Sequence, residues 1–219
     1  MKFLSDVEIE GIFQAFSREN PQPKSELDYV NPFTLVVSVV LSAQATDKSV
    51  NAATAALYER VKSPRQMVEL GEEGLIGYIK SIGLFRNKAK NIIGLSKILC
   101  EKYGDDAGLD ETRPFPKTMD EFLQLPGVGR KSANVAMNVI YGEATMPVDT
   151  HILRISKRIG FCNEDTPETV EAALVKKIPE KFMQYAHHHL VLHGRYVCTA
   201  RNPKCESCLI EKWCKKNLL

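Results

Sequence analysis

The chain has 219 residues, a net charge of +2 and an ordinary globular composition, with 44% hydrophobic and 26% charged residues. This length allows one large domain or two small ones, and the nearly balanced charge excludes an overall basic field. The first ten residues lack the apolar run of a signal peptide, and the most apolar stretch, residues 33–41, is too short to span a membrane. We therefore expect a reducing compartment, in which the six cysteines form no disulfide framework.

Capping motifs and helical periodicity predict helices along the whole chain. Ser5 and Glu8 form a capping box for the first helix. Asn31 and Pro32 start a second helix, which is apolar nearly all round and should be buried. The expected helices cover residues 6–18, 33–43, 47–61, a short one after 63, 72–81, 86–103, 118–125, 130–141, 150–159, 166–178 and 180–198. The helix at 86–103 should carry a basic face of Arg86, Lys88, Lys90 and Lys97. No stretch shows sustained strand alternation, so the fold class is all-α with roughly ten helices.

Residues 125–131, LPGVGRK, predict a tight turn between two helices. Gly127 and Gly129 end the helix that Thr118 caps, and a second helix begins at about Arg130. Its apolar face recurs with helical spacing, and its polar face contains Lys131, Asn134 and Asn138. Glycines leave backbone N–H groups uncovered, and the start of the second helix adds its positive end. The unit is therefore typical of a phosphate-binding hairpin.

Asp149 lies beyond the helix that carries Lys131, at the start of the helix expected at 150–159. The helix carrying Lys131 is ~18 Å long, and the loop over residues 142–148 can stretch ~24 Å. The chain can therefore return Asp149 to the Lys131 end of the helix. From these residues alone two simpler interpretations stay open: Lys131 as a phosphate contact, and Asp149 as a helix N-cap.

The C-terminal region holds four cysteines within seventeen residues, in the pattern Cys198-x6-Cys205-x2-Cys208-x5-Cys214. Short loops let four thiolates converge on one metal centre, and the spacing fits zinc as well as an iron–sulfur cluster. All four ligand positions are filled, so the centre should be structural. Arg201 and Lys204 lie between the first two cysteines, in a region from residue 176 onward that has nine Lys/Arg and three Glu. This loop predicts a grip on phosphate, although the cations would also offset a negative cluster.

Taken together, these motifs resemble the endonuclease III family of helix-hairpin-helix DNA glycosylases. LPGVGRK at 125–131, VDTHI at 148–152, LSAQATD at 41–47, IKSIGL at 79–84, HGRYVC before the first cysteine and the cysteine pattern itself occur in family order over nearly the whole chain. His189 departs from the family pattern, because a bulkier aromatic would be expected there. We interpret it as a packing position that leaves the catalytic residues unaffected.

The resemblance implies two all-α domains with a DNA cleft between them. One is a six-helix domain at residues 23–134, and the other joins residues 1–22 to 135–219 and carries a 4Fe–4S cluster on the four cysteines. The implied substrates are double-stranded DNA with damaged, oxidised pyrimidines, and abasic sites. The implied protein is a monomeric bacterial enzyme of the cytoplasm, associated with the nucleoid and not with a membrane.

The resemblance also implies a bifunctional mechanism for base excision repair. A damaged base must leave the stack before its sugar can be reached. Lys131 would attack C1′, expel the base, and cleave the strand 3′ to the abasic site by β-elimination through a Schiff base. Asp149 would accept a proton or stabilise the cationic sugar. Gln44 and Leu84 would fill the hole left by the extruded base, whereas Asp47 and His151 are expected to be structural.

Three other kinds of protein share part of this pattern. Adenine-mismatch glycosylases share the hairpin and the cluster but usually lack a lysine at the position of Lys131 and carry an extra C-terminal domain. A thymine-mismatch enzyme of similar build is also disfavoured by Lys131. A non-enzymatic DNA-binding module would use the hairpin and basic tail equally well, but it would not need Lys131 paired with Asp149.

Overall fold

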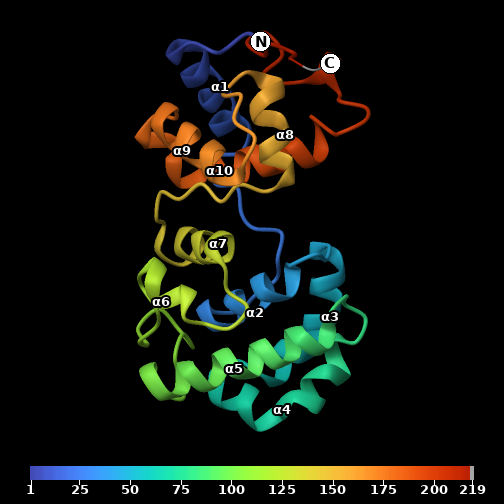
Figure 1. Cartoon of the computed structure of the whole chain (residues 1–219), viewed down its shortest axis with the longest axis vertical. Helices are drawn as coiled ribbons and strands as arrows, with labels where there is room; N and C mark the ends of the chain where they lie inside the picture. The colour runs from blue at the N-terminus through green and yellow to red at the C-terminus, as the bar shows by residue number, and fades with distance from the viewer. Residues whose placement is uncertain (218–219) are drawn as a thin grey trace. The chain divides into compact units, whose positions relative to one another are not determined.

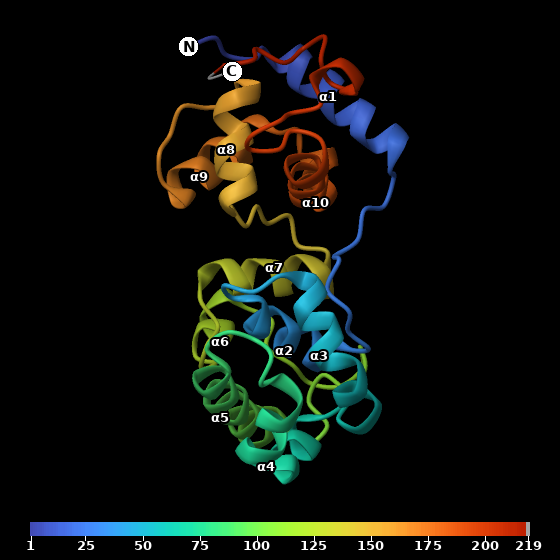
Figure 2. The same ribbon diagram turned by 90° about the vertical axis from the view of Figure 1, so that its right-hand side faces the viewer.

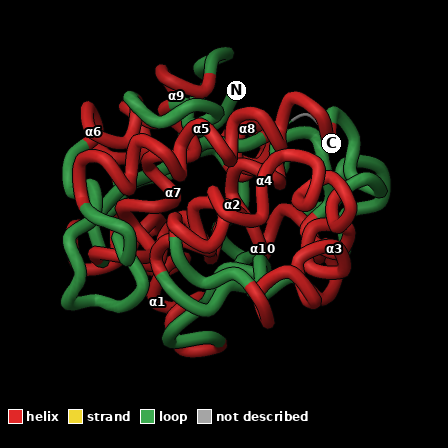
Figure 3. The backbone as a smooth tube through the Cα atoms, turned by 90° about the horizontal axis from the view of Figure 1, so that it is seen from below, coloured by secondary structure: helices red, strands yellow, loops and turns green. Residues whose placement is uncertain are grey.

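The computed structural model describes residues 1–217, and within them the chain forms helices and loops but no strand (Figures 1 and 3). The expected all-α class is confirmed. The α-helices are α1 (Asp6–Glu19), α2 (Pro32–Ser42), α3 (Asp47–Arg60), α4 (Pro64–Ile79), α5 (Phe85–Tyr103), α6 (Met119–Leu123), α7 (Arg130–Tyr141), α8 (Thr150–Ile159), α9 (Pro167–Lys177) and α10 (Glu180–Tyr196), with a short 3-10 helix η1 at Cys205–Ser207. No helix in this part of the chain is both long and apolar enough to cross a membrane.

The chain folds into two compact units. Unit 2 is Ser25–Tyr141, and unit 1 combines Met1–Lys24 with Gly142–Leu219. Each unit has its own hydrophobic core, and the two cores share no residue. The boundary expected at residue 134 lies inside α7, which stays whole within unit 2. The division into functional domains stays a prediction.

Helix α2 is the centre of unit 2. Its residues from Phe33 to Leu41 are all buried, as the continuous apolar run predicts. Figure 1 shows α2 between α7 and α5, and it contacts both helices as well as α3. The Asn31 side chain caps its start by accepting the N–H of Thr34, 2.9 Å away. Because α2 packs against α3, α5 and α7, these three helices are positioned by their contacts with it.

Helix α4 contains the interruption that the sequence predicts between a short helix and residues 72–81. Gly71 has φ +71° and ψ 172°, so α4 is two helical segments joined at a kink. A positive φ of this kind strains any residue with a side chain, which explains why glycine stands here.

Unit 1 is built on α8 and α10, which pack against each other, with α1 and α9 beside them (Figure 2). The chain ends meet in this unit: the Asn217 side chain receives the Lys2 N–H at 3.1 Å and donates to the Lys2 carbonyl at 2.7 Å. His189 is buried, stacks on Phe16 with ring centroids 5.6 Å apart, and places Nε2 2.8 Å from the Asn20 carbonyl. The interpretation of His189 as a packing residue is therefore confirmed.

Three side chains that the sequence places on polar or basic helix faces are buried. Asn134 and Asn138 of α7 are 3% and 6% exposed, and Lys88 of α5 is 5% exposed. The two asparagines both make polar interactions, which stabilise their amides away from water. The prediction that Lys88 belongs to a basic face of α5 was wrong, because helical periodicity locates polar residues without showing what covers them. The polar face of α7 holds the exposed Lys131 together with the two buried asparagines.

Candidate nucleic-acid interface and metal centre

The hairpin of residues 125–131 is held on unit 2 by its apolar residues. Leu125 and Val128 are 2% and 7% exposed and belong to the unit 2 core. The Val128 N–H donates to the Leu125 carbonyl at 3.0 Å, which closes the turn. Gly127 and Gly129 are exposed between and after these anchors. The turn is therefore fixed by burial on one side while its backbone faces solvent on the other.

Gly127 and Gly129 differ in backbone conformation and in the space around their Cα atoms. Gly127 has φ +81°, and a methyl group added there would lie 3.0 Å from Cβ of Asn91 and 3.1 Å from Cγ1 of Val40. At Gly129 an added methyl group would meet nothing within 4 Å. Gly127 is thus needed for the fold of the turn, whereas Gly129 leaves open space above the start of α7.

Lys131 lies in the first turn of α7 with its side chain exposed. The first N–H groups of a helix have no intrahelical acceptor, and they give this end a partial positive charge. Hairpin backbone, helix start and Lys131 therefore form one cationic surface suited to a phosphate.

Asp149 is the N-cap of α8 in unit 1, and its Oδ1 accepts the N–H of Ile152 at 2.8 Å. The interpretation as an N-cap is confirmed. The hydrogen bond fixes the carboxylate in one orientation, and the side chain remains half exposed. Lys131 and Asp149 belong to different units, and their pairing stays a prediction.

Gln44 and Leu84 share an unusual backbone. They have φ values of +54° and +59°, in the left-handed region that disfavours residues with side chains. Gln44 follows α2, and Leu84 is the N-cap of α5. Both side chains are exposed, Leu84 to 57%. Strain of this kind persists where the surrounding fold imposes it, and it occurs often at functional sites.

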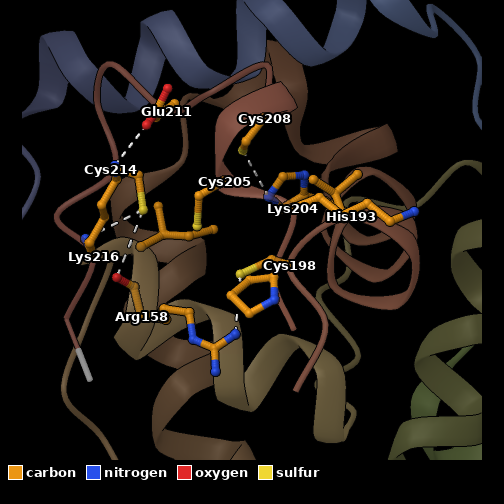
Figure 4. Close-up of a pocket in the computed structure, with 12 residues that line it drawn as sticks. Arg158, His193, Cys198, Lys204, Cys205, Cys208, Glu211, Cys214 and Lys216 are labelled. Carbon is orange, nitrogen blue, oxygen red and sulfur yellow. Dashed lines mark hydrogen bonds and ion pairs between the residues drawn. The ribbon is translucent and has the colours of Figure 1, made fainter. Parts of the chain in front are cut away.

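The four cysteines line one cavity in unit 1 (Figure 4). All four are free thiols. Burial raises the pKa of the Cys208 and Cys214 thiols, and the other sulfurs of the set raise it further. Four thiolates brought together in one cavity are stabilised by a cationic centre among them. The donor set therefore fits a metal centre.

Four thiols line one shared space. A zinc ion and an iron–sulfur cluster both accept four thiolates, so this cavity fits either centre.

Nitrogen atoms that the sequence analysis missed lie next to the sulfurs. Arg158 Nη1 lies 3.6 Å from Cys198 Sγ, the Lys216 N–H lies 3.4 Å from Cys214 Sγ, and His193 Nε2 lies 3.8 Å from Cys208 Sγ. Burial lowers the pKa of His193 to about 4, so its ring is neutral at pH 7. N–H groups close to thiolates orient them and tune the metal centre that they hold.

Two arginines of α8 hold the basic loop between Cys198 and Cys205 in place by hydrogen bonds to its backbone carbonyls. Arg158 donates to the carbonyls of Thr199 and Ala200 at 2.7 and 3.2 Å, and Arg154 donates to the Cys198 carbonyl at 3.0 Å. The sequence offered one signal for these two arginines. They are four residues apart on a helix whose isoleucines form its buried face. The side chains of Arg201 and Lys204, in the same loop, are exposed to solvent.

The fold and the two sites define a class of protein. Residues 37–180 match the family described as HhH-GPD superfamily base excision DNA repair protein. Residues 198–214 match the iron–sulfur binding domain of endonuclease III. The class is therefore a base excision DNA repair protein with a helix-hairpin-helix fold and an iron–sulfur domain.

Curated relatives make the family specific. The chain is 52% identical to endonuclease III of Rickettsia felis over 204 residues, covering 93% of this chain and 92% of the relative. It is 46% identical to endonuclease III of Escherichia coli K12 over 204 residues, covering 93% of each. The chain belongs to the endonuclease III family. It is accordingly a DNA glycosylase with lyase activity at abasic sites, and it carries a 4Fe–4S cluster.

Solved structures agree with this assignment. A non-covalent endonuclease III–DNA complex superposes with a TM-score of 0.86 at 39% identity, covering 98% of this chain and 97% of that one. A trapped endonuclease III–DNA covalent intermediate superposes with a TM-score of 0.85 at 40% identity and the same coverage. A thermostable thymine-DNA glycosylase has a TM-score of 0.78 at 20% identity, which shows a shared fold alone.

Proposed function

We propose that this chain removes oxidised pyrimidines from duplex DNA and cleaves the strand 3′ to the resulting abasic site through a Schiff base on Lys131. The observation that carries the proposal is an exposed lysine in the first turn of α7, directly after a hairpin built to hold phosphate. Endonuclease III relatives of this fold are known in complex with DNA and as a trapped covalent intermediate. Double-stranded DNA is therefore the proposed partner.

The reaction uses the amine in two stages. The Lys131 nitrogen attacks C1′, the C1′–base bond breaks, and the base leaves with the bonding electrons and a proton. The amine loses its second proton as the sugar ring opens to a Schiff base. Loss of a C2′ proton then expels the 3′ oxygen and cuts the strand. Because the imine accepts the developing charge, no external cofactor takes part in these steps.

Asp149 is the proposed acid–base partner of Lys131. A carboxylate there accepts the proton released during attack and stabilises the cationic sugar as the base departs. Its hydrogen bond to the Ile152 N–H holds the group in a fixed orientation, so capping and chemistry use the same carboxylate.

Gln44 and Leu84 are the proposed plugs for the space that an extruded base leaves. An apolar side chain pushed between base pairs offsets part of the cost of unstacking. Leu84 is suited to this because its side chain is exposed and its backbone adopts a left-handed conformation at the start of α5. The strain is consistent with a position kept for binding and not for stability.

The two hairpin glycines provide a matched pair of variants. Gly127→Ala is expected to lower the free energy of unfolding by about 1–3 kcal/mol, because φ is positive and the methyl group is crowded by Asn91 and Val40. Gly129→Ala is expected to leave stability within about 0.5 kcal/mol but to weaken DNA binding roughly tenfold, because its methyl group occupies the open side where a phosphate would lie. Urea unfolding and DNA titration measure both effects. Equal effects of the two substitutions on stability and binding would contradict the proposal that Gly127 shapes the turn and Gly129 faces the phosphate.

Arg201 and Lys204 are proposed to grip the DNA backbone from the cysteine loop. Changing both to glutamine is expected to weaken binding to damaged and undamaged duplexes alike and to flatten the dependence of log Kd on log salt by up to about two. Titrations at several salt concentrations test this, with Lys181→Gln as a control lysine of unit 1. Unchanged binding would assign these cations to offsetting the cluster charge.

The cluster itself is proposed to be structural, because four cysteines occupy its ligand positions and hold the basic loop in place. We further propose that the protein acts as a monomer in the bacterial cytoplasm, in association with the nucleoid. Sedimentation of the free protein and its complex with one abasic duplex tests the monomer: a dimer in both states would refute it.

The proposed substrate class is tested with a panel of duplexes, each carrying one modified base. Oxidised or ring-saturated pyrimidines are expected to be released with strand cutting, whereas adenine or thymine in a mismatch is expected to remain in place. Base release and strand cutting are scored separately on denaturing gels. Release of mismatched adenine without strand cutting would favour an adenine-mismatch enzyme, and binding without any release would favour a non-enzymatic module.

A further inference from the structure

Lys88 carries a buried amine for which the free protein supplies no partner. The residue is 5% exposed, and its Nζ has no hydrogen-bond partner. A lysine is almost never fully buried without a partner, because removing an ammonium group from water is costly. The proposed catalytic steps do not use Lys88. Its burial therefore needs an explanation outside the stability of the free protein.

Lys88 lies in the first turn of α5, immediately behind Leu84. Its backbone N–H donates to the Leu84 carbonyl at 3.0 Å. Long helical side chains lean toward the N-terminus of their helix, so the amine is directed back over this first turn. The turn has no side-chain cap and no acidic residue. A helix start of this kind, with a lysine behind it, favours an anion.

The same face of α5 also touches the hairpin. Asn91 lies three residues after Lys88, which places the two side chains on one face about one turn apart. Asn91 is the residue that crowds Gly127, at 3.0 Å from an added methyl group. Lys88 is therefore within one helical turn of the proposed phosphate-binding hairpin and one turn from the proposed wedge residue Leu84.

We propose that Lys88 is a positioning residue for base extrusion, and that its amine takes a phosphate oxygen of the bound DNA strand as its missing hydrogen-bond acceptor. The inference rests on the proposed DNA-repair function. Arg86 and Lys90 are exposed on the same stretch of α5. Their positive charges make this surface unsuited to a cationic ligand. Leu84 has a left-handed backbone with φ +59°. The proposal requires this backbone to move when the wedge enters DNA, so that the buried amine reaches the strand.

The experiment compares Lys88→Met, which keeps the shape of the side chain and removes the amine, with Lys90→Met, an exposed lysine of the same helix. In the free protein Lys88→Met should raise the melting temperature by about 3 °C, because a buried unpaired amine is lost. It should weaken binding to a duplex with a stable abasic analogue about tenfold and reduce the salt slope by about one. Lys90→Met should leave the melting temperature unchanged.

A second measurement follows the unaltered protein and uses one conservative variant only to assign its resonance. With lysines labelled at 13Cε, the Lys88 resonance, identified by its absence in Lys88→Arg, should shift when the abasic duplex is added. An unshifted resonance, or unchanged affinity and salt slope in Lys88→Met, would overturn the proposal. Failure of the proposed function is a different result, because the unaltered protein would then neither bind nor cleave the abasic duplex.

Discussion

Changing Lys131 to alanine is expected to abolish covalent trapping on abasic-site DNA. Borohydride reduces a Schiff base to a stable amine, so the intact protein should form a cross-linked complex, and the variant, which lacks the nucleophile, should form none. The rate of strand cutting should fall by about 10⁴-fold or more, in the range found when a covalent nucleophile is removed. Denaturing gels measure the trapped complex.

The control for this variant is Lys90→Ala, which removes an exposed lysine of the same unit. It should trap normally. Lys131→Ala should still bind the duplex within about tenfold of the intact protein, since one phosphate contact at most is lost. Failure of the intact protein to trap would sink the lyase mechanism, and persistent trapping in Lys131→Ala would move the nucleophile to another amine.

Asp149→Asn separates chemistry from capping. Asparagine is as good an N-cap as aspartate, so the hydrogen bond to the Ile152 N–H and the stability of α8 should be kept. Base release should nevertheless slow by about 10²–10⁴-fold, the range that general acid–base groups contribute. A full rate in Asp149→Asn would leave Asp149 with its structural role alone.

Loss of one cluster ligand is expected to have the second large effect. In Cys208→Ser the visible iron–sulfur absorption should disappear, and DNA affinity should fall about 100-fold, because the loop that carries Arg201 and Lys204 loses its anchor. Cys198 belongs to the unit 1 core, so that core should loosen as well. Cys100→Ser, at a half-buried position in unit 2, is the matched control and should retain colour and binding.

Hydrogen exchange should locate the damage in Cys208→Ser. Peptides from α8 and α10 should lose protection, whereas those from α2 and α5 should keep it, because the two units have separate cores. Uniform loss over both units would contradict this independence. A colourless, zinc-containing intact protein would refute the iron–sulfur assignment.

Helix limits were predictable to within one or two residues because their signals are local. Capping boxes at Ser5 and Thr118 involve residues three apart, and the structure shows both in place. The glycine at position 71 interrupts α4 for an equally local reason. The cysteine spacing likewise required only that short loops let four thiols converge, and they line one cavity.

Burial of polar groups could be decided only by the tertiary structure. Lys88, Asn134 and Asn138 occupy sequence positions that resemble a solvent-facing helix face, yet neighbouring elements cover them. The left-handed backbones of Gln44 and Leu84 were also invisible, because a strained dihedral reflects the packing around a turn and not the preference of its residue. Arg158, the donor beside Cys198, comes from a helix forty residues away in the sequence.

The sequence by itself determined the all-helical class, the glycine hairpin with Lys131 behind it, the cap at Asp149 and the four-cysteine loop, since each depends on residues close together in the chain. The tertiary structure decided which of these groups are buried, how the basic loop is supported, and that the four cysteines line one cavity. The physical reason is that burial and convergence depend on contacts between distant segments, which no local pattern encodes.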